Sequence, residues 1–278
     1  MIDENNHVIS CHGSLITNDA ILTAAHCFKD KEAIPKLFIV LGALEPLKEG
    51  SPPAENYNKR RRIKSIHEID KVFLHNEYKL NRSEAYHDLA IAKMKEKIKL
   101  NRFLHPLCLP LQPIEQNTGE EIERGLQLQT VVVTGYRTDF AETDGQLHFI
   151  EPLIQTHAYC NQSFFNTSII NIDDNNVIYE AIPNGFQSSI MCATVETAFG
   201  ASCRGDSGAP LFRFEFFNGT SEKRYMQIGT LHGSVNSCDD YYPGIYSRLE
   251  DPSNLAFVKS SLGQINGSLL YSASSVGM

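Results

Sequence analysis

The sequence predicts an all-β fold in which short antiparallel strands form a sandwich or a barrel. Apolar runs rich in β-branched residues recur along the whole chain, and turn residues separate them, which is typical of antiparallel sheets. Helical periodicity is confined to a short segment at 157–164 and to 254–261, where Asp251-Pro252-Ser253 supplies a start signal. The predicted strands lie at 14–16, 20–23, 37–41, 63–66, 89–94, 131–134, 149–155, 209–214, 228–231 and 244–248.

Three segments outside the predicted strands have the composition of loops or tails. Residues 43–57 contain three prolines and a glycine, and we expect them to form a long surface loop. Residues 110–127 are polar, contain four glutamates and look like a connection between two halves of the chain. Residues 263–278 are mostly small, and we expect a disordered tail there.

The composition excludes several classes of function. The 278 residues include 25 Lys+Arg and 33 Asp+Glu, and the resulting net charge of −8 argues against nucleic acid as the main partner. The only basic run, Lys59-Arg60-Arg61-Arg62, is short, and we expect it in a solvated loop. No apolar stretch approaches the ~20 residues of a membrane-spanning helix, so no membrane partner is expected.

The cysteines and glycosylation sequons favour an oxidising, extracellular environment. Five N-x-[ST] sequons accompany the cysteines, and neither a C-x-x-C pair nor H-E-x-x-H occurs, so zinc patterns are absent. An odd number of cysteines leaves one free or bonded to another chain. The first ten residues do not resemble a secretory leader, so we expect that signal upstream of Met1. The seven cysteines are Cys11, Cys27, Cys108, Cys160, Cys192, Cys203 and Cys238.

Three short motifs carry the chemistry-bearing residues. Thr23-Ala24-Ala25-His26-Cys27 ends one predicted strand, and Tyr86-His87-Asp88-Leu89-Ala90-Ile91 opens another. Gly205-Asp206-Ser207-Gly208-Ala209-Pro210 lies between two strands. A G-D-S-G-x-P hexapeptide should occur by chance in a chain of this length with a probability on the order of 10⁻⁴. This hexapeptide is the most specific signal in the sequence.

From about residue 10 to residue 261, the chain resembles the trypsin/chymotrypsin family of serine proteases. Further matches to that family occur at 11–16, 106–110, 134–136 and 243–246. The resemblance implies two six-stranded antiparallel Greek-key β-barrels with a short C-terminal helix, the first strand being absent from this chain. It implies a protease domain over 1–262, divided into an N-terminal barrel (1–115), a C-terminal barrel (128–250) and a helix (252–262).

The resemblance also assigns catalytic roles. A serine hydroxyl needs a base to remove its proton, and a histidine base needs a carboxylate to fix its tautomer. By resemblance, Ser207 is the nucleophile, His26 the base and Asp88 the carboxylate, and the backbone N–H groups of Gly205 and Ser207 form the oxyanion hole. The order His–Asp–Ser distinguishes this arrangement from an α/β-hydrolase, whose order is Ser–Asp–His. Asp206 would receive the ammonium group that activation cleavage frees in this family.

The resemblance implies three disulfides and leaves one cysteine over. The family pairing joins Cys11 to Cys27, Cys160 to Cys192 and Cys203 to Cys238. In multi-domain members of the family the cysteine at the position of Cys108 bonds to a propeptide or a regulatory chain, and a free surface thiol is the alternative. We therefore expect protein or peptide substrates, protein inhibitors, and a tethered upstream segment at Cys108 as partners.

The sequence departs from the family at several positions. The family's Ile/Val-led activation motif is absent before Cys11, so we expect the chain as given to resemble a zymogen with a poor oxyanion hole. His12 replaces a usual glycine. Leu231-His232-Gly233 replaces Ser-Trp-Gly, which removes a hydroxyl that normally bonds to the buried aspartate. We therefore expect the carboxylate of Asp88 to have fewer donors and to be less stabilised.

The predicted specificity pocket is open and uncharged. Ala201 stands at the pocket floor, six residues before the serine, where an acidic residue would select Lys or Arg. Gly233 and Gly244 match the two wall positions. We expect cleavage after large apolar or aromatic residues. Cleavage after Lys or Arg stays an alternative, because Asp239 and Asp240 are close in sequence and could reach the pocket.

The sequence thus predicts a secreted serine endopeptidase that needs no cofactor and no metal. Calcium binding by the loop at 45–55 is a weaker alternative, since its three glutamates are more typical of a solvated loop. The intact motifs argue against a non-catalytic protease homologue that acts in binding or regulation, and the missing activation strand and Leu231 argue for it. A third interpretation, an unrelated β-rich glycoprotein, requires the three motifs to be coincidental.

Overall fold

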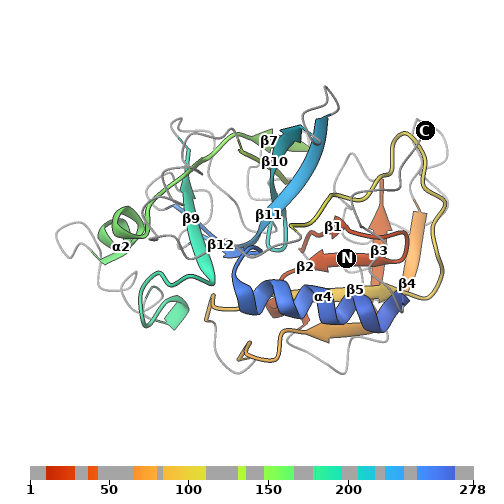
Figure 1. The fold of residues 1–278 in the computed structure, drawn as a ribbon, viewed down its shortest axis with the longest axis horizontal. Helices are drawn as coiled ribbons and strands as arrows, with labels where there is room; N and C mark the ends of the chain where they lie inside the picture. The colour runs from red at the N-terminus through yellow and green to blue at the C-terminus, as the bar shows by residue number, and fades with distance from the viewer. Residues whose placement is uncertain are drawn as a thin grey trace, which may run out of the picture.

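The computed structural model describes residues 11–28, 37–42, 65–79, 84–110, 131–135, 147–165, 178–195 except 179, 206–216, 223–234 and 243–266. Within these residues the chain forms two curled antiparallel β-sheets and two α-helices (Figure 1). The predicted all-β fold of two antiparallel barrels is confirmed. The basic run at 59–62, the predicted loop at 43–57 and the predicted connection from residue 111 to residue 127 lie outside the described residues.

The first sheet contains five strands in the order β1-β2-β5-β4-β3. Its core includes Ile21, Ile39 and Met94, whose side chains are buried together with Phe28. β4 is the longest strand of this sheet, and its register shifts between Ile69 and Lys71 where it passes from β3 to β5. The strands are β1 (Ser14–Leu15), β2 (Ala20–Thr23), β3 (Phe38–Leu41), β4 (Ser65–Leu74) and β5 (Ala90–Met94).

The second sheet contains seven strands in the order β7-β6-β10-β11-β12-β9-β8. β7 and β8 are neighbours in the sequence, separated only by Glu151 and Pro152, yet they lie at opposite ends of this order. The sheet therefore closes on itself, and one broken segment completes a barrel of six chain segments. The strands are β6 (Val131–Gly135), β7 (His148–Ile150), β8 (Leu153–Ile154), β9 (Ile190–Thr194), β10 (Pro210–Phe216), β11 (Lys223–Gly233) and β12 (Gly244–Arg248).

The described strands fit the predicted barrels: five lie in the first sheet, whose first strand was expected to be absent, and six chain segments form the second. The described residues supply five strands to the first sheet and seven to the second. In the second sheet the prediction of one strand at 149–155 is wrong in detail, because Pro152 has no N–H to donate and the segment changes partner there, from β6 to β9. The described part of the predicted strand at 63–66 begins a longer strand, β4, which runs from Ser65 to Leu74.

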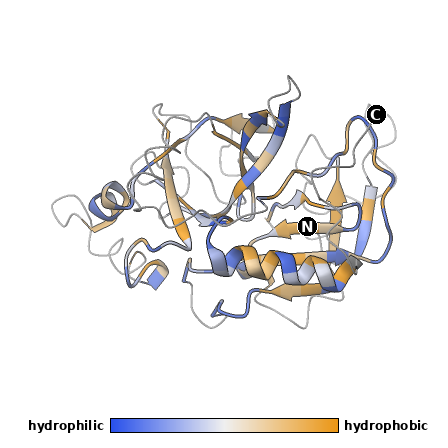
Figure 2. Ribbon diagram, viewed as in Figure 1, coloured by the Kyte–Doolittle hydropathy of each residue, from blue (hydrophilic) through white to orange (hydrophobic). Residues whose placement is uncertain are grey.

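The C-terminal helix α4 (Pro252–Asn266) follows the last strand of the second sheet and covers the first sheet (Figures 1 and 2). Its apolar residues Phe257, Val258 and Leu262 pack with Leu22 and Ile91 of β2 and β5. Ile265 packs against the same cluster, so the apolar face of the helix continues beyond residue 262. The predicted disordered tail at 263–278 is therefore wrong for residues 263–266, which are helical, and the rest of it lies outside the described residues. The other helix, α2 (His157–Phe165), buries Cys160 and Phe164.

Candidate active site

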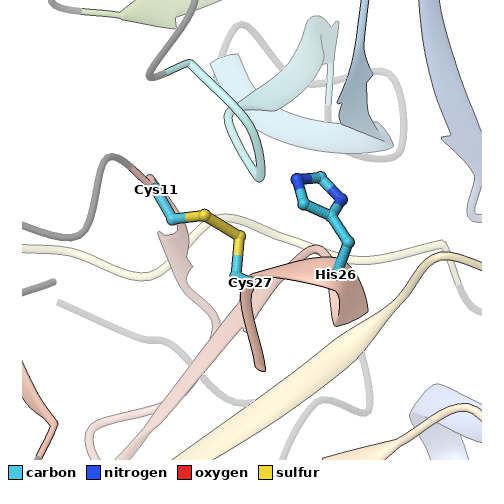
Figure 3. Close-up of side chains that lie close together, drawn as sticks. All are labelled: Cys11, His26 and Cys27. Carbon is cyan, nitrogen blue, oxygen red and sulfur yellow. A yellow bond between two sulfur atoms is a disulfide. The ribbon is translucent and has the colours of Figure 1, made fainter. Parts of the chain in front are cut away.

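His26 is presented by a short 3-10 turn, η1 (Ala25–Phe28), that directly follows β2. Ala25 and Phe28 are buried in the core of the first sheet, so the turn is anchored on both sides of His26. The Cys11–Cys27 disulfide ties the same turn to the segment before β1. Figure 3 shows the imidazole of His26 beside this disulfide and projecting from the turn toward the strands of the second sheet. The local fold thus holds the ring outward and restricts its backbone.

Asp88 lies two residues before β5, and its side chain is completely buried. Its Oδ1 accepts a hydrogen bond from the backbone N–H of His26 at 2.8 Å. Its Oδ2 lies 2.6 Å from Nδ1 of His26. The preceding residue, His87, has a φ of 56°, a left-handed conformation that turns the chain sharply just before the aspartate. The structure therefore brings together two of the predicted catalytic residues that are 62 positions apart.

A second imidazole contacts the same carboxylate oxygen. His232, near the end of β11, places its Nδ1 2.5 Å from Oδ2 of Asp88. The rings of His26 and His232 meet edge to face, with centroids 5.2 Å apart. We expected Asp88 to have fewer hydrogen-bond donors because Leu231 has no hydroxyl. That expectation is wrong, since the ring N–H of His232 supplies a donor instead. Sequence reasoning missed His232, and the available signal was a histidine at a position where the family has tryptophan.

The carboxyl group of Asp88 is held in its charged form. Burial alone would raise its pKa, but the neighbouring imidazoles of His26 and His232 outweigh that effect and hold the pKa well below its usual value. An ionised carboxylate can only accept hydrogen bonds, so both rings carry a proton on Nδ1. In the neutral rings Nε2 then has a free lone pair, which is the tautomer that a general base needs.

Ser207 lies in a tight turn, two residues before the buried Ala209 and three before β10. Its carbonyl accepts a hydrogen bond from the N–H of His12 at 2.7 Å, and the N–H of the next residue, Gly208, donates to the Leu231 carbonyl at 2.7 Å. Its Oγ donates to the carbonyl of His232 at 3.3 Å. Among the described residues no hydrogen bond joins this hydroxyl to His26. The serine thus lies in the same neighbourhood as the other two residues, with its hydroxyl turned to a different acceptor.

Gly208 allows the serine turn to approach the histidine segment closely. Its φ is 84°, and a Cβ at this position would lie 2.2 Å from the carbonyl oxygen of His12 and 2.3 Å from Oγ1 of Thr23. Only glycine fits both the backbone conformation and the space. Thr23 ends β2 just before the turn of His26, so this contact joins the serine turn of the second sheet to the histidine segment of the first.

Asp206 is buried beside the serine, with a relative exposure of 4%. Nδ1 of His12 lies 3.9 Å from its Oδ1. A Cβ on Gly135 would lie 2.2 Å from the same oxygen, so the glycine at the end of β6 makes room for the carboxylate. The pairing of Asp206 with a freed ammonium stays a prediction. Gly205, the other predicted oxyanion-hole residue, lies outside the described residues.

The predicted specificity pocket is described only in part. Gly233 ends β11 and faces open space, since a Cβ there would meet no atom within 4 Å. Gly244 begins β12 and is buried, and it pairs with Ala193 of β9. The remaining predicted pocket residues, Ala201, Asp239 and Asp240, lie outside the described residues. The preference for apolar residues therefore stays a prediction.

The structure contains two of the three disulfides that the resemblance implies, Cys11–Cys27 and Cys160–Cys192. Cys203 and Cys238 lie outside the described residues. Cys108 is a partly exposed free thiol whose backbone pairs with β11: its N–H donates to the Tyr225 carbonyl and its carbonyl accepts from the Gln227 N–H. Burial raises the pKa of its thiol, so the protonated form dominates at neutral pH.

One further group of potential metal-binding side chains lies near Asp88. His75, Glu77 and His87 cluster there, but the two rings are stacked, with an interplanar angle of 22° and centroids 4.7 Å apart. The proposed calcium loop at 45–55 lies outside the described residues. None of the helices in the described residues is long and apolar enough to span a membrane.

Comparisons with known proteins show which family the chain resembles. The family model described as Trypsin matches residues 2–255. Serine protease 7 of Drosophila melanogaster is 27% identical over 256 residues, which cover 87% of this chain and 55% of that protein. Clotting factor G beta subunit of Tachypleus tridentatus is 24% identical over 90% of this chain and 71% of its own length. Vitamin K-dependent protein C of Mus musculus is 26% identical over 94% of this chain and 48% of its own length. The chain thus spans about half the length of several relatives that it matches.

Proposed function

The chain belongs to the trypsin family of serine proteases, and from this premise we propose that it is a serine endopeptidase that acts on protein substrates through an acyl-enzyme. The observation that carries the proposal is the 2.6 Å contact between His26 Nδ1 and the buried carboxylate of Asp88. It supports a general base that is held in the tautomer with a free Nε2, in the neighbourhood of a serine in a G-D-S-G turn.

Each side chain has one role in the proposed reaction. Nε2 of His26 takes the proton of Ser207 as Oγ forms a bond to the carbonyl carbon of the scissile peptide. His26 then gives that proton to the leaving amine, and the C–N bond breaks to leave an acyl-enzyme. A water molecule, deprotonated by the same nitrogen, hydrolyses the ester and restores the serine. Asp88 stays ionised throughout and stabilises the imidazolium.

The serine hydroxyl must change its hydrogen-bond partner before it reacts. Its Oγ donates to the His232 carbonyl at 3.3 Å, so attack requires a rotation about χ1 that directs the hydroxyl to His26. Preorganised backbone donors at Gly205 and Ser207 would then stabilise the oxyanion, a contribution of ~3 kcal/mol per donor in acyl-transfer enzymes. A secreted enzyme is consistent with the two disulfides of the structure.

The second candidate function is a non-catalytic homologue that binds protein partners. One observation favours it, namely that the hydroxyl of Ser207 donates to a backbone carbonyl instead of to His26. The contact of the buried carboxylate with Nδ1 of His26 favours the endopeptidase, because a charge at this place fixes the tautomer of the base and stabilises its imidazolium. The endopeptidase is therefore the better supported proposal.

Hydrolysis of a panel of peptide substrates tests the proposal and its specificity together. The expressed chain is assayed with Phe, Leu, Ala or Arg before the scissile bond, and Ser207→Ala serves as the matched control. We expect slow turnover by the wild type, in keeping with the zymogen-like state expected of the chain as given, with the highest rate for Phe or Leu and none above background by the variant. Preference for Arg would overturn the apolar pocket, and equal rates for both proteins would favour the non-catalytic alternative.

A further inference from the structure

His232 contacts two members of the proposed triad through two different groups. Its ring Nδ1 lies 2.5 Å from Oδ2 of Asp88, and its backbone carbonyl accepts the hydroxyl of Ser207 at 3.3 Å. Its ring also meets the His26 ring edge to face, 5.2 Å between centroids. The side chain is 15% exposed, so it is largely shielded from water where it meets a completely buried carboxylate.

The carboxylate of Asp88 is oriented by three donors. The backbone N–H of His26 donates to Oδ1, while the Nδ1–H groups of His26 and His232 both donate to Oδ2. Removing the His232 donor would leave Oδ2 with a single partner and a lone pair in a site that water cannot enter freely. Hydrogen bonds to a buried ion are among the strongest in proteins, so this donor is expected to control where the carboxylate sits.

We propose that His232 is a positioning residue of the active site: its Nδ1–H holds the carboxylate of Asp88 in place and thereby fixes the orientation and tautomer of His26. The proposal rests on the proposed endopeptidase function where it concerns turnover. In this role the imidazole N–H of His232 supplies the donor that Leu231, which has no hydroxyl, cannot supply.

Two imidazoles therefore share one carboxylate. The Nδ1–H groups of His26 and His232 both bond to Oδ2 of Asp88, so loss of one ring changes the hydrogen bonding of the other. Among the described residues, the ionisable side chains that contact the His232 ring are Asp88 and His26. Tyr78 lies near the charge of Asp88. Burial is the main cause and this charge the second cause of a raised pKa of the Tyr78 hydroxyl, which therefore stays neutral. Asp206 adjoins Ser207, whose hydroxyl meets the His232 carbonyl.

Two substitutions separate a positioning role from a structural one. His232→Phe keeps a ring of similar size and removes the donor, whereas His232→Asn keeps an N–H donor near the position of Nδ1 and does not titrate. The backbone carbonyl that accepts Ser207 remains in both variants. His105→Asn, which replaces an exposed histidine, is the matched control.

Steady-state kinetics against pH is the first measurement. We expect H232F to lower kcat about tenfold or more with KM little changed, since the donor bonds to Asp88 and not to substrate. We expect H232N to recover kcat to within about threefold of the wild type. The pH profile of kcat should be the same in H105N as in the wild type and altered in H232F, in which Asp88 loses a donor.

Nitrogen-15 NMR of the full chain with labelled histidine is the second measurement, and it does not require turnover. We expect two slowly exchanging Nδ1–H signals in strong hydrogen bonds in the wild type, one from His26 and one from His232. H232F should remove one signal and speed the exchange of the other, while H232N should remove one and leave the other unchanged. If the wild type hydrolyses no peptide but shows this pattern, the proposed function fails and the positioning role stands.

Three results would overturn the proposal. The first is a single protected Nδ1–H signal in the wild type. The second is an H232F variant with wild-type kcat, pH profile and His26 exchange. The third is an H232N variant as impaired as H232F, which would mean that the imidazole serves packing and that the donor has no separate role.

Discussion

At the scale of single residues, the site depends on one buried carboxylate. Asp88 is fully buried, accepts one backbone N–H and two imidazole N–H groups, and has a pKa below its usual value despite its burial. The loss of any one of these donors leaves a lone pair of the buried carboxylate unpaired, which costs folding free energy. The chemistry of His26 therefore depends on a group that never contacts the substrate.

Asp88→Asn removes the charge of this side chain and nearly keeps its shape, so it tests the role of the charge. The amide has nearly the same size, but one of its two ends donates hydrogen bonds, so it cannot accept the backbone N–H on one end and the ring N–H groups on the other. It also carries no charge to stabilise an imidazolium. We expect kcat to fall by about 10⁴-fold, as expected when the tautomer of a triad histidine is no longer fixed. Stopped or steady-state kinetics at pH 7.5 measures this loss, and a fall of less than about tenfold would contradict the role assigned to the carboxylate.

The same substitution should change the pH dependence of stability. The pKa of Asp88 is lower in the folded protein than in the unfolded chain, so the unfolded chain binds more protons in acid. The stabilisation from this carboxylate is therefore complete above about pH 4 and is lost as the pH falls toward the folded pKa. Urea unfolding of the wild type between pH 3 and 6 should show a steeper loss than D88N, and parallel curves would contradict the pKa direction.

Leu231 and His232 show what sequence reasoning could and could not reach at this scale. The motif spacing identified His26 and Asp88, because family motifs are local patterns of neighbouring residues. The loss of the hydroxyl at Leu231 was also visible in the sequence. Its replacement by the ring of His232 was not, because the direction of a side chain at a strand end depends on the partner that tertiary packing places beside it.

At the scale of elements, the active site forms where turns from different sheets meet. The 3-10 turn of His26 and the segment of Asp88 both adjoin strands of the first sheet, β2 and β5, which pair directly. Ser207 precedes β10 and His232 lies near the end of β11, and these strands pair in the second sheet. Each sheet thus contributes two of the four side chains, and the serine turn lies so close to the histidine segment that only glycine fits at residue 208.

Gly208→Ala tests that approach. The new Cβ would lie 2.2 Å from the His12 carbonyl oxygen and 2.3 Å from Thr23 Oγ1, at a backbone φ of 84°. Both backbone strain and overlap oppose it, so we expect unfolding to become easier by about 2 kcal/mol or more and turnover to be lost. Gly263→Ala, at a position in α4 that faces open space, is the matched control and should be neutral or stabilising. Wild-type stability in G208A, measured by thermal unfolding, would contradict the contact.

His75 directly follows β4, and its ring contacts Phe257 of α4. It is buried, and burial, together with the neighbouring His87, lowers the pKa of its imidazole below the usual value. The unfolded chain then binds more protons below about pH 6.5, so stability falls as the pH drops through this region. Charged neighbours Glu77 and Asp251 oppose this shift but do not cancel it.

His75→Phe should therefore flatten the pH dependence of stability between pH 7.5 and 5. It keeps a ring against Phe257 and removes the group that must be protonated on unfolding. Urea unfolding at both pH values measures the difference, with the exposed His105→Gln as the control. An H75F protein that loses as much stability on acidification as the wild type and H105Q would show that His75 does not contribute.

The positions of the strands could be predicted from the sequence, but the pairing between strands could not. Runs such as 131–134 and 244–248 are apolar and β-branched, and they are strands β6 and β12 in the structure. The run at 149–155 was also recognised, but its halves pair with β6 and β9 at opposite ends of the sheet order. Pairing is a non-local property, and no pattern within seven residues encodes which distant edge each half will meet.

At the scale of the whole molecule, the C-terminal helix joins the two halves. α4 leaves the second sheet after β12 and packs on β2 and β5 of the first, where Phe257, Val258 and Leu262 share a core with Leu22 and Ile91. β2 and β5 are also the strands that position His26 and Asp88. The same packing that buries the helix therefore supports the strands that carry half of the active site.

The fold class followed from composition, periodicity and the family motifs over nearly the whole chain. The hydrogen-bond partner of the Ser207 hydroxyl could not be predicted, because this group rotates about χ1 and the sequence does not specify its acceptor. The proposed triad of His26, Asp88 and Ser207 therefore requires one change, a rotation of the Ser207 side chain that directs its hydroxyl to His26.

Labelling with an active-site-directed phosphonate tests that claim most directly. The expressed chain is treated with a fluorophosphonate, digested and mapped by mass spectrometry, with His26→Ala as a variant that keeps the serine and removes its base. The account predicts a single phosphonylated residue, Ser207, in the wild type, and labelling that is at least about 10³-fold slower in H26A. Absence of the adduct from Ser207, or equal labelling rates in the two proteins, would contradict it.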